Sequence, residues 1–301
     1  MKVYFIGAGP GAADLITIRG AEILSRAQLV MYAGSLVSEA MLSHCRANPL
    51  IVNTAKLNLD EQVEYYLQAK ERGWDVARLH SGDPSIYGAM AEQMRRLREL
   101  EIGYEVVPGV PSFVASAAVL ETELTKPNIS QTIILTRTPG RASPVPAKES
   151  LRSLAAHHAT LCIFLSGANL PEVIEELLVH YSKDTPVALV QRASWPEERI
   201  HRGRLGELLS EIEPRSWLLT TMLLVGQTLD ENIVSESRLY AADYTHRFRR
   251  AADFLRRPES PDYGGQVAPS PPSDLAPSPP LATLDKLATP DKSGSPAKNP
   301  E

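Results

Sequence analysis

The sequence has little cysteine, no excess of basic residues and no long hydrophobic run. Cys45 and Cys162 are its only cysteines and lie far apart, so neither a disulfide framework nor a CxxC zinc site is expected. The formal net charge of −5 disfavours a nucleic-acid partner, which requires a basic surface. No apolar run approaches the ~20 residues of a membrane helix, and no secretory signal pattern opens the chain. We therefore expect a cytoplasmic protein without a metal and without membrane or nucleic-acid partners.

Apolar strand segments alternate with helical segments through most of the chain. The expected strands in the first half cover residues 3–6, 29–32, 50–52, 76–79 and 104–107. After a linker, the pattern restarts with strands at 132–135, 160–165, 187–190 and 222–225. Such alternation predicts α/β architecture with mainly parallel sheets and helices on both faces. We expect two α/β domains, residues 1–120 and 121–246, with a ligand cleft between them.

The C-terminal segment has a different composition. Residues 258–301 contain 11 of the 24 prolines and a single aromatic residue, Tyr263. A segment of this composition cannot bury enough apolar surface to fold, so we expect a disordered tail.

The turn at residues 80–88, His-Ser-Gly-Asp-Pro-Ser-Ile-Tyr-Gly, follows one of the expected buried strands. It therefore lies at the carboxyl end of a strand, where open α/β sheets bind ligands. Gly82 allows close approach of the backbone, and Asp83 offers a carboxylate to a cationic or hydroxyl-bearing ligand. An ordinary β-turn is the alternative interpretation. His80 is expected to be a histidine with satisfied hydrogen bonds, and a ligand-facing imidazole is the alternative.

Three further turns rich in glycine or proline also follow apolar strands, at residues 7–11, 32–37 and 108–112. The first matches the dinucleotide fingerprint Gly7-x-Gly9-x-x-Ala12, but Pro10 interrupts the helix that should open there. The second strand ends in Ala-Gly-Ser and not in a ribose-binding acid. The dinucleotide-binding interpretation therefore fails on context.

Taken together, the four turns resemble those of the tetrapyrrole methylase family, over about residues 2–245. Members transfer methyl from S-adenosylmethionine to precorrins and related substrates. Tyr32-Ala33-Gly34-Ser35-Leu36-Val37 resembles the branch that methylates C-11 of precorrin-4. Uroporphyrinogen methylases carry an Asp, their proposed base, where this chain has Ala33 or Gly34. The resemblance therefore leaves the base unassigned.

The resemblance implies a site at the strand ends. Its cofactor residues would be Pro10, Gly82, Asp83, Ile86, Pro111, Ser112, Leu165 and Ala193. The tetrapyrrole would face Gly9, Gly11, Tyr32, Gly34 and Ser35. Arginines at the cleft should bind substrate carboxylates, and by position the candidates are Arg137, Arg141 and Arg192. Lys56 matches a lysine proposed as a proton donor, although a solvated lysine is an equal alternative. Related methylases are homodimers, so we expect a homodimer here.

Other functions remain open at this point. The chain could be a methylase of the same fold that acts on another precorrin position, on uroporphyrinogen, or on an RNA or protein substrate. A nucleotide-dependent oxidoreductase and a non-enzymatic α/β binding protein are more distant alternatives. The resemblance fits a cobalt-containing precorrin and a cobalt-free one equally well.

Overall fold

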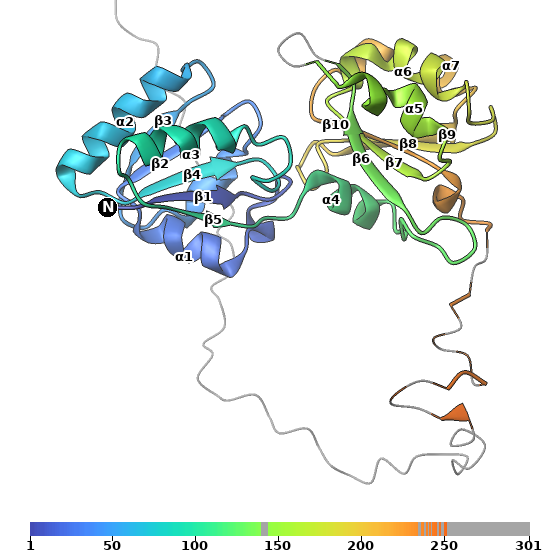
Figure 1. Ribbon diagram of the computed structural model, residues 1–301, viewed down its shortest axis with the longest axis horizontal. Coiled ribbons are helices and arrows are strands. Elements are labelled where there is room, and N and C mark those ends of the chain that lie inside the picture. Colours follow the sequence, from blue (N-terminus) through green and yellow to red (C-terminus); the bar gives the residue numbers. More distant parts are fainter. Residues whose placement is uncertain are drawn as a thin grey trace, which may run out of the picture. The chain divides into compact units, whose positions relative to one another are not determined.

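The computed structural model describes residues 1–139, 144–233, 236–237, 239, 241, 243–245, 247 and 250–251. Residues 1–237 form one compact unit, drawn in Figure 1, that contains two five-stranded sheets. The tail expected at residues 258–301 lies outside the described part of the chain. Within that part, no helix is both long enough and apolar enough to cross a bilayer.

The first sheet is wholly parallel, with strand order β3-β2-β4-β1-β5. Its strands are β1 (Val3–Gly7), β2 (Leu29–Tyr32), β3 (Leu50–Asn53), β4 (Val76–His80) and β5 (Tyr104–Val107). Helix α1 (Ile18–Arg26) covers one face, and α2 (Leu59–Arg72) and α3 (Met90–Glu99) cover the other, as Figure 1 shows. Each face carries its own buried apolar cluster.

The helix ends follow from local chemistry. The Thr17 side chain accepts a hydrogen bond from Gly20 N and caps α1. Asn58 and Glu61 form a capping box at the start of α2. Gly73 ends that helix at φ 66°, a left-handed conformation that glycine adopts without strain. These caps fix where the chain leaves each helix and re-enters the sheet.

The second sheet is mixed, with strand order β6-β7-β10-β8-β9. Its strands are β6 (Ile133–Arg137), β7 (Thr160–Phe164), β8 (Pro186–Gln191), β9 (Arg199–Arg204) and β10 (Thr221–Val225). Only β6 and β7 pair in parallel within this described sheet, and its other three pairings are antiparallel. Over both sheets parallel pairing still predominates, as expected. The antiparallel edge arises because residues 192–198 join β8 to β9 too briefly for a parallel crossover.

The helices of the second half cover both faces of its sheet. They are α4 (Ser112–Val119), α5 (Leu151–Ala155), α6 (Leu170–Leu177) and α7 (Leu208–Glu211). Helices α5 to α7 share one buried cluster with the sheet, and α4 packs on the opposite face beside Cys162, Ala188 and Met222. Cys162 is fully buried, as expected for a small core residue. Helix α4 thus continues directly from the first sheet and packs on the second.

The loops after the neighbouring strands β1, β4 and β5 are in direct backbone contact at the carboxyl ends of these strands. Gly9 and Gly82 exchange backbone hydrogen bonds of 3.2 and 2.8 Å. A Cβ atom added to Gly7 would lie 2.5 Å from the backbone of Gly109, so a side chain has no room there. The glycines of three predicted turns therefore allow one tight junction of loops at this edge of the sheet.

Candidate active site

A cleft of about 570 Å³ opens at this junction and is lined by residues of both halves. All eight residues that the resemblance assigns to the cofactor line it: Pro10, Gly82, Asp83, Ile86, Pro111, Ser112, Leu165 and Ala193. They come from the loops after β1, β4, β5, β7 and β8. The volume is within the range typical of small-molecule sites, ~300–1,000 Å³.

Asp83 ties two of these loops together. Its Oδ2 accepts a hydrogen bond of 2.8 Å from Gly109 N, and its Oδ1 accepts one of 2.8 Å from Ser85 N and one from Ser85 Oγ. Burial alone would raise the pKa of the carboxyl group, but these hydrogen bonds outweigh it and hold the pKa below its ordinary value. Asp83 is therefore an ionised anchor between the loops after β4 and β5.

Two buried polar residues of β4 also line the cleft. The Arg78 guanidinium donates to Gln93 Oε1 at 3.2 Å and to Gln62 Oε1 at 3.3 Å. His80 is 6% exposed, and its Nε2 atom has no hydrogen-bond partner. Burial and the charge of Arg78 lower the pKa of His80 to about 3, although hydrogen bonding to the Gly88 backbone works in the opposite direction. The expectation of a fully satisfied histidine is therefore wrong: the ring is neutral and half of its bonding capacity is unused.

Unusual backbone conformations concentrate around the cleft. Five lining residues other than glycine have left-handed φ values of 48° to 53°: Tyr87, Ala89, Leu165, Arg192 and Thr220. Such conformations are costly for residues with a side chain and cluster at functional sites. Leu165 is also 65% exposed, which leaves an apolar surface available to a ligand.

The residues predicted to face the tetrapyrrole lie beside this cleft and not among its lining residues. Gly9, Gly11, Tyr32, Gly34 and Ser35 flank Pro10, Ala33 and Leu36, which do line it. Tyr32 is 5% exposed, and its hydroxyl lies 3.4 Å from Glu39 Oε1. Gly34 N donates to Asn53 Oδ1 at 3.1 Å.

The predicted basic residues are more dispersed. Arg137 donates to the carbonyls of Thr138 and Pro144, and its guanidinium lies 5.9 Å from the centre of the Tyr87 ring. Arg192 lines the cleft. Lys56 is exposed on the turn after β3, outside the cleft lining. Arg141 lies outside the described residues.

Trp195 is a cleft residue that sequence reasoning missed. Its Nε1 donates to Pro10 O at 2.8 Å, and the neighbouring Ser194 Oγ accepts from Ala12 N at 3.0 Å. Its ring packs so closely on Gly11 that an added Cβ there would overlap it. These contacts, here called the latch, join the loop after β8 to the glycine turn after β1. A tryptophan two residues after Ala193 was the only available signal, and it does not indicate a partner 185 residues away.

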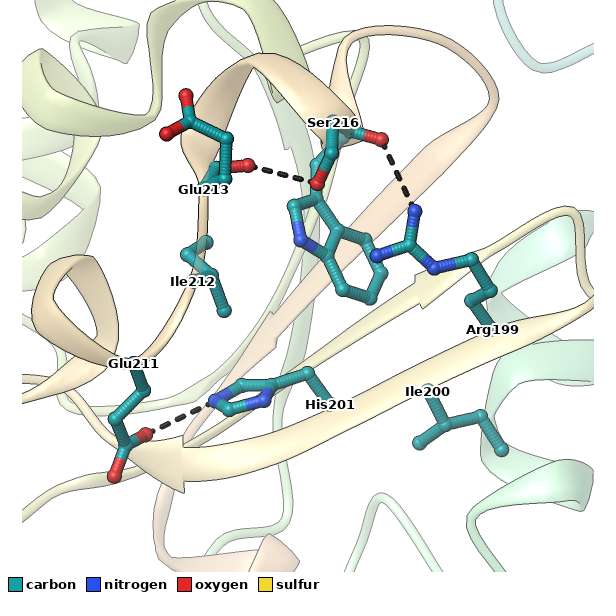
Figure 2. A pocket seen from close by; sticks show the side chains of 8 residues that line it. Arg199, Ile200, His201, Glu211, Ile212, Glu213 and Ser216 are labelled. Carbon is teal, nitrogen blue, oxygen red and sulfur yellow. Dashed lines mark hydrogen bonds and ion pairs between the residues drawn. The ribbon is translucent and has the colours of Figure 1, made fainter.

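A second pocket, of about 430 Å³, lies on the edge strand β9 and is shown in Figure 2. His201 Nε2 lies 3.0 Å from Glu211 Oε2, and Arg199 donates to Ser216 O while its guanidinium packs over the Trp217 ring. Its polar groups thus satisfy one another, and none of the predicted site residues lies there. We therefore assign the functional site to the first cleft.

Comparisons with known proteins agree with this geometry. Residues 2–209 match the family model of the Tetrapyrrole (Corrin/Porphyrin) Methylases. The chain is 50% identical to the precorrin-4 C(11)-methyltransferase of Pseudomonas aeruginosa, over 83% of this chain and 99% of the relative. It is 42% identical to the cobalt-precorrin-4 C(11)-methyltransferase of Methanocaldococcus jannaschii, over 83% and 96%.

Solved structures of tetrapyrrole methyltransferases also resemble this chain. The X-ray structure of a cobalt precorrin-4 methyltransferase superimposes with a TM-score of 0.73 at 42% identity, covering 76% of this chain and 96% of that one. The uroporphyrin-III C-methyltransferase of Thermus thermophilus, solved with S-adenosylhomocysteine, gives a TM-score of 0.66 at 26% identity, covering 79% and 97%.

Proposed function

The chain belongs to the tetrapyrrole (corrin/porphyrin) methylases, and from that membership we propose that it transfers a methyl group from S-adenosylmethionine to C-11 of precorrin-4 or cobalt-precorrin-4 in cobalamin biosynthesis. A relative named for this reaction is 50% identical over 83% of this chain. The observation that carries the proposal is the convergence of all eight expected cofactor residues on one cleft.

The cleft residues fit an adenosyl cofactor. Gly82 at φ +63° presents backbone to the cleft, close to Pro111 and Ser112. Ile86 and the exposed Leu165 offer apolar surface for the adenine ring. Asp83 would hold the loop that carries Gly82 and Ile86 in place through its hydrogen bonds to Ser85 and Gly109.

The reaction requires alignment more than acid–base chemistry. When bound, S-adenosylmethionine supplies a methyl group on a sulfonium, which an electron-rich ring carbon can attack in line. Cleft residues that fix two ligands relative to each other can supply much of the rate. No carboxylate occupies the position of the proposed base of uroporphyrinogen methylases, since Ala33 or Gly34 stands there.

The tetrapyrrole is proposed to bind over the carboxyl ends of β1 and β2. Gly9, Gly11, Tyr32, Gly34 and Ser35 would face it there, since Pro10, Ala33 and Leu36 of the same two turns reach the cofactor cleft. Arg137 would bind a substrate carboxylate. A proton-donor role for Lys56 rests on the family resemblance alone.

We also propose, from the same resemblance, that the protein works as a homodimer. Its location in the cytoplasm stays a prediction from the sequence.

A methyl-transfer assay tests the proposed function. The purified chain, S-adenosylmethionine and precorrin-4 should give a product methylated at C-11, identified by NMR, and uroporphyrinogen III should give none. Asp83→Ala should weaken S-adenosylhomocysteine binding in calorimetry about tenfold, because it frees the loop that carries the cofactor residues. Asp60→Ala removes an 80%-exposed carboxylate and is the matched control. Binding of NAD without binding of S-adenosylhomocysteine would contradict the proposal.

A further inference from the structure

Three buried side-chain atoms lack a hydrogen-bond partner among the described residues, and all three belong to residues that line the cleft. They are His80 Nε2, Ser116 Oγ and Thr220 Oγ1. A buried polar atom left without a partner costs free energy, and such atoms are rare in folded proteins. Their occurrence at one cleft indicates that something outside the chain completes their hydrogen bonding.

The three residues come from separate segments. His80 ends β4 in the first sheet, Ser116 is in the middle of α4, and Thr220 immediately precedes β10 in the second sheet. Local strain in a single loop therefore cannot explain all three. Elsewhere, buried hydroxyl groups are satisfied: Thr160 Oγ1 donates to Leu124 O at 2.9 Å and lies 2.9 Å from Thr228 Oγ1.

The three groups offer complementary chemistry. The His80 ring is neutral and its Nε2 has no partner, so this nitrogen can donate or accept a hydrogen bond according to the tautomer. The hydroxyl groups of Ser116 and Thr220 can each donate and accept. A ligand that matches this set carries both donors and acceptors spread along its length, as a nucleoside joined to an amino acid does.

We propose that His80, Ser116 and Thr220 are ligand-binding residues of this cleft, and that their free atoms hydrogen-bond the polar groups of the adenosyl cofactor. The inference rests on the proposed function and adds three side-chain contacts to a site otherwise built from backbone and apolar surface. Because the contacts come from both sheets, the bound cofactor ties the two halves of the cleft together.

Substitutions that delete only the polar atom test the proposal. Ser116→Ala, Thr220→Val and His80→Phe should each weaken S-adenosylhomocysteine binding about fivefold to tenfold in calorimetry, the equivalent of one hydrogen bond. The melting temperature without ligand should stay the same or rise for Ser116→Ala and Thr220→Val, because each removes a desolvated group that has no bond to lose. Thr160→Val is the matched control: it should lower that melting temperature and leave the affinity unchanged.

The outcomes distinguish failure of the proposed function from failure of the three proposed contacts. If the wild-type chain does not bind S-adenosylhomocysteine, the proposed function and this inference fall together. If the wild type binds and the three variants bind equally tightly, ordered water satisfies these atoms and only this inference is overturned. A fall in both affinity and ligand-free melting temperature for Ser116→Ala and Thr220→Val would show a structural role and would also overturn it.

Discussion

His80 makes the stability of the first sheet sensitive to acid. Its pKa is about 3 in the folded chain, because burial and Arg78 disfavour the imidazolium, and it returns to ~6.5 on unfolding. Below pH 6.5, His80 therefore binds a proton in the unfolded chain but stays neutral in the folded chain. The free energy of unfolding should fall as the pH decreases through this range.

We expect this effect to cost about 2 kcal/mol between pH 6.5 and pH 5. Urea denaturation at both pH values measures it. His80→Phe keeps an aromatic ring beside Phe5, whose ring centre lies 5.7 Å from that of His80, and should lose that part of the acid sensitivity. An unchanged loss of stability in the variant would mean that other groups cause it.

Two substitutions at Gly34 distinguish the steric effect of a side chain in this turn from the effect of a negative charge there. An added Cβ would meet the Asn53 amide, so any side chain disturbs this turn. Aspartate would add a negative charge where the carboxylate-rich substrate is proposed to bind. Relative to Gly34→Ala, the steric control, Gly34→Asp should lower kcat/KM for precorrin-4 about 100-fold.

S-adenosylhomocysteine affinity should differ little between these two variants, because Gly34 does not line the cofactor cleft. Equal loss of turnover in both variants would remove the electrostatic argument. A selective loss of cofactor affinity in Gly34→Asp would place this turn at the cofactor instead.

The loop after β8 serves the site in two ways. It contributes Arg192, Ala193 and Trp195 to the cleft, and through the latch it holds the glycine turn after β1. The indole of Trp195 fills the space that a side chain at residue 11 would need. Gly11 and Trp195 should therefore be energetically coupled.

A double-mutant cycle tests this coupling. Gly11→Ala overpacks the latch and should lower the free energy of unfolding by about 2 kcal/mol. In a Trp195→Ala background, where the indole is absent, the same substitution should cost much less. Urea denaturation of the four proteins gives the coupling energy, and additive effects would show that the two residues act independently.

The cleft depends on the whole molecule, because loops from both sheets supply the residues that line it. The first supplies the loops after β1, β2, β4 and β5, and the second supplies the loops after β7 and β8 and the segment before β10. Helix α4 follows the first sheet in the chain but packs on the second. Neither half lines this cleft by itself.

The family resemblance leads us to expect a homodimer, so multi-angle light scattering at micromolar concentration should give twice the chain mass of 33.0 kDa. A value near the mass of one chain would contradict this expectation.

The sequence predicted the features that depend on neighbouring residues. Apolar runs predicted nine of the ten strands in the described part of the chain, and the family resemblance of the turns after them implied eight of the residues that line the cleft. Strand β9 was missed, because Arg-Ile-His-Arg-Gly-Arg lies on an edge and has no apolar run to reveal it. The mixed order of the second sheet was missed with it.

Short stretches of sequence were enough to predict the apolar strands and the glycine turns at their ends, since each depends on backbone preferences and apolar patterns over a few residues. Three features emerge only from the fold: Trp195 covers Gly11, Asp83 accepts a hydrogen bond from Gly109 N, and His80 has a nitrogen without a partner in the cleft. These facts depend on which distant side chains meet, and on which polar atoms the surrounding packing leaves without a partner.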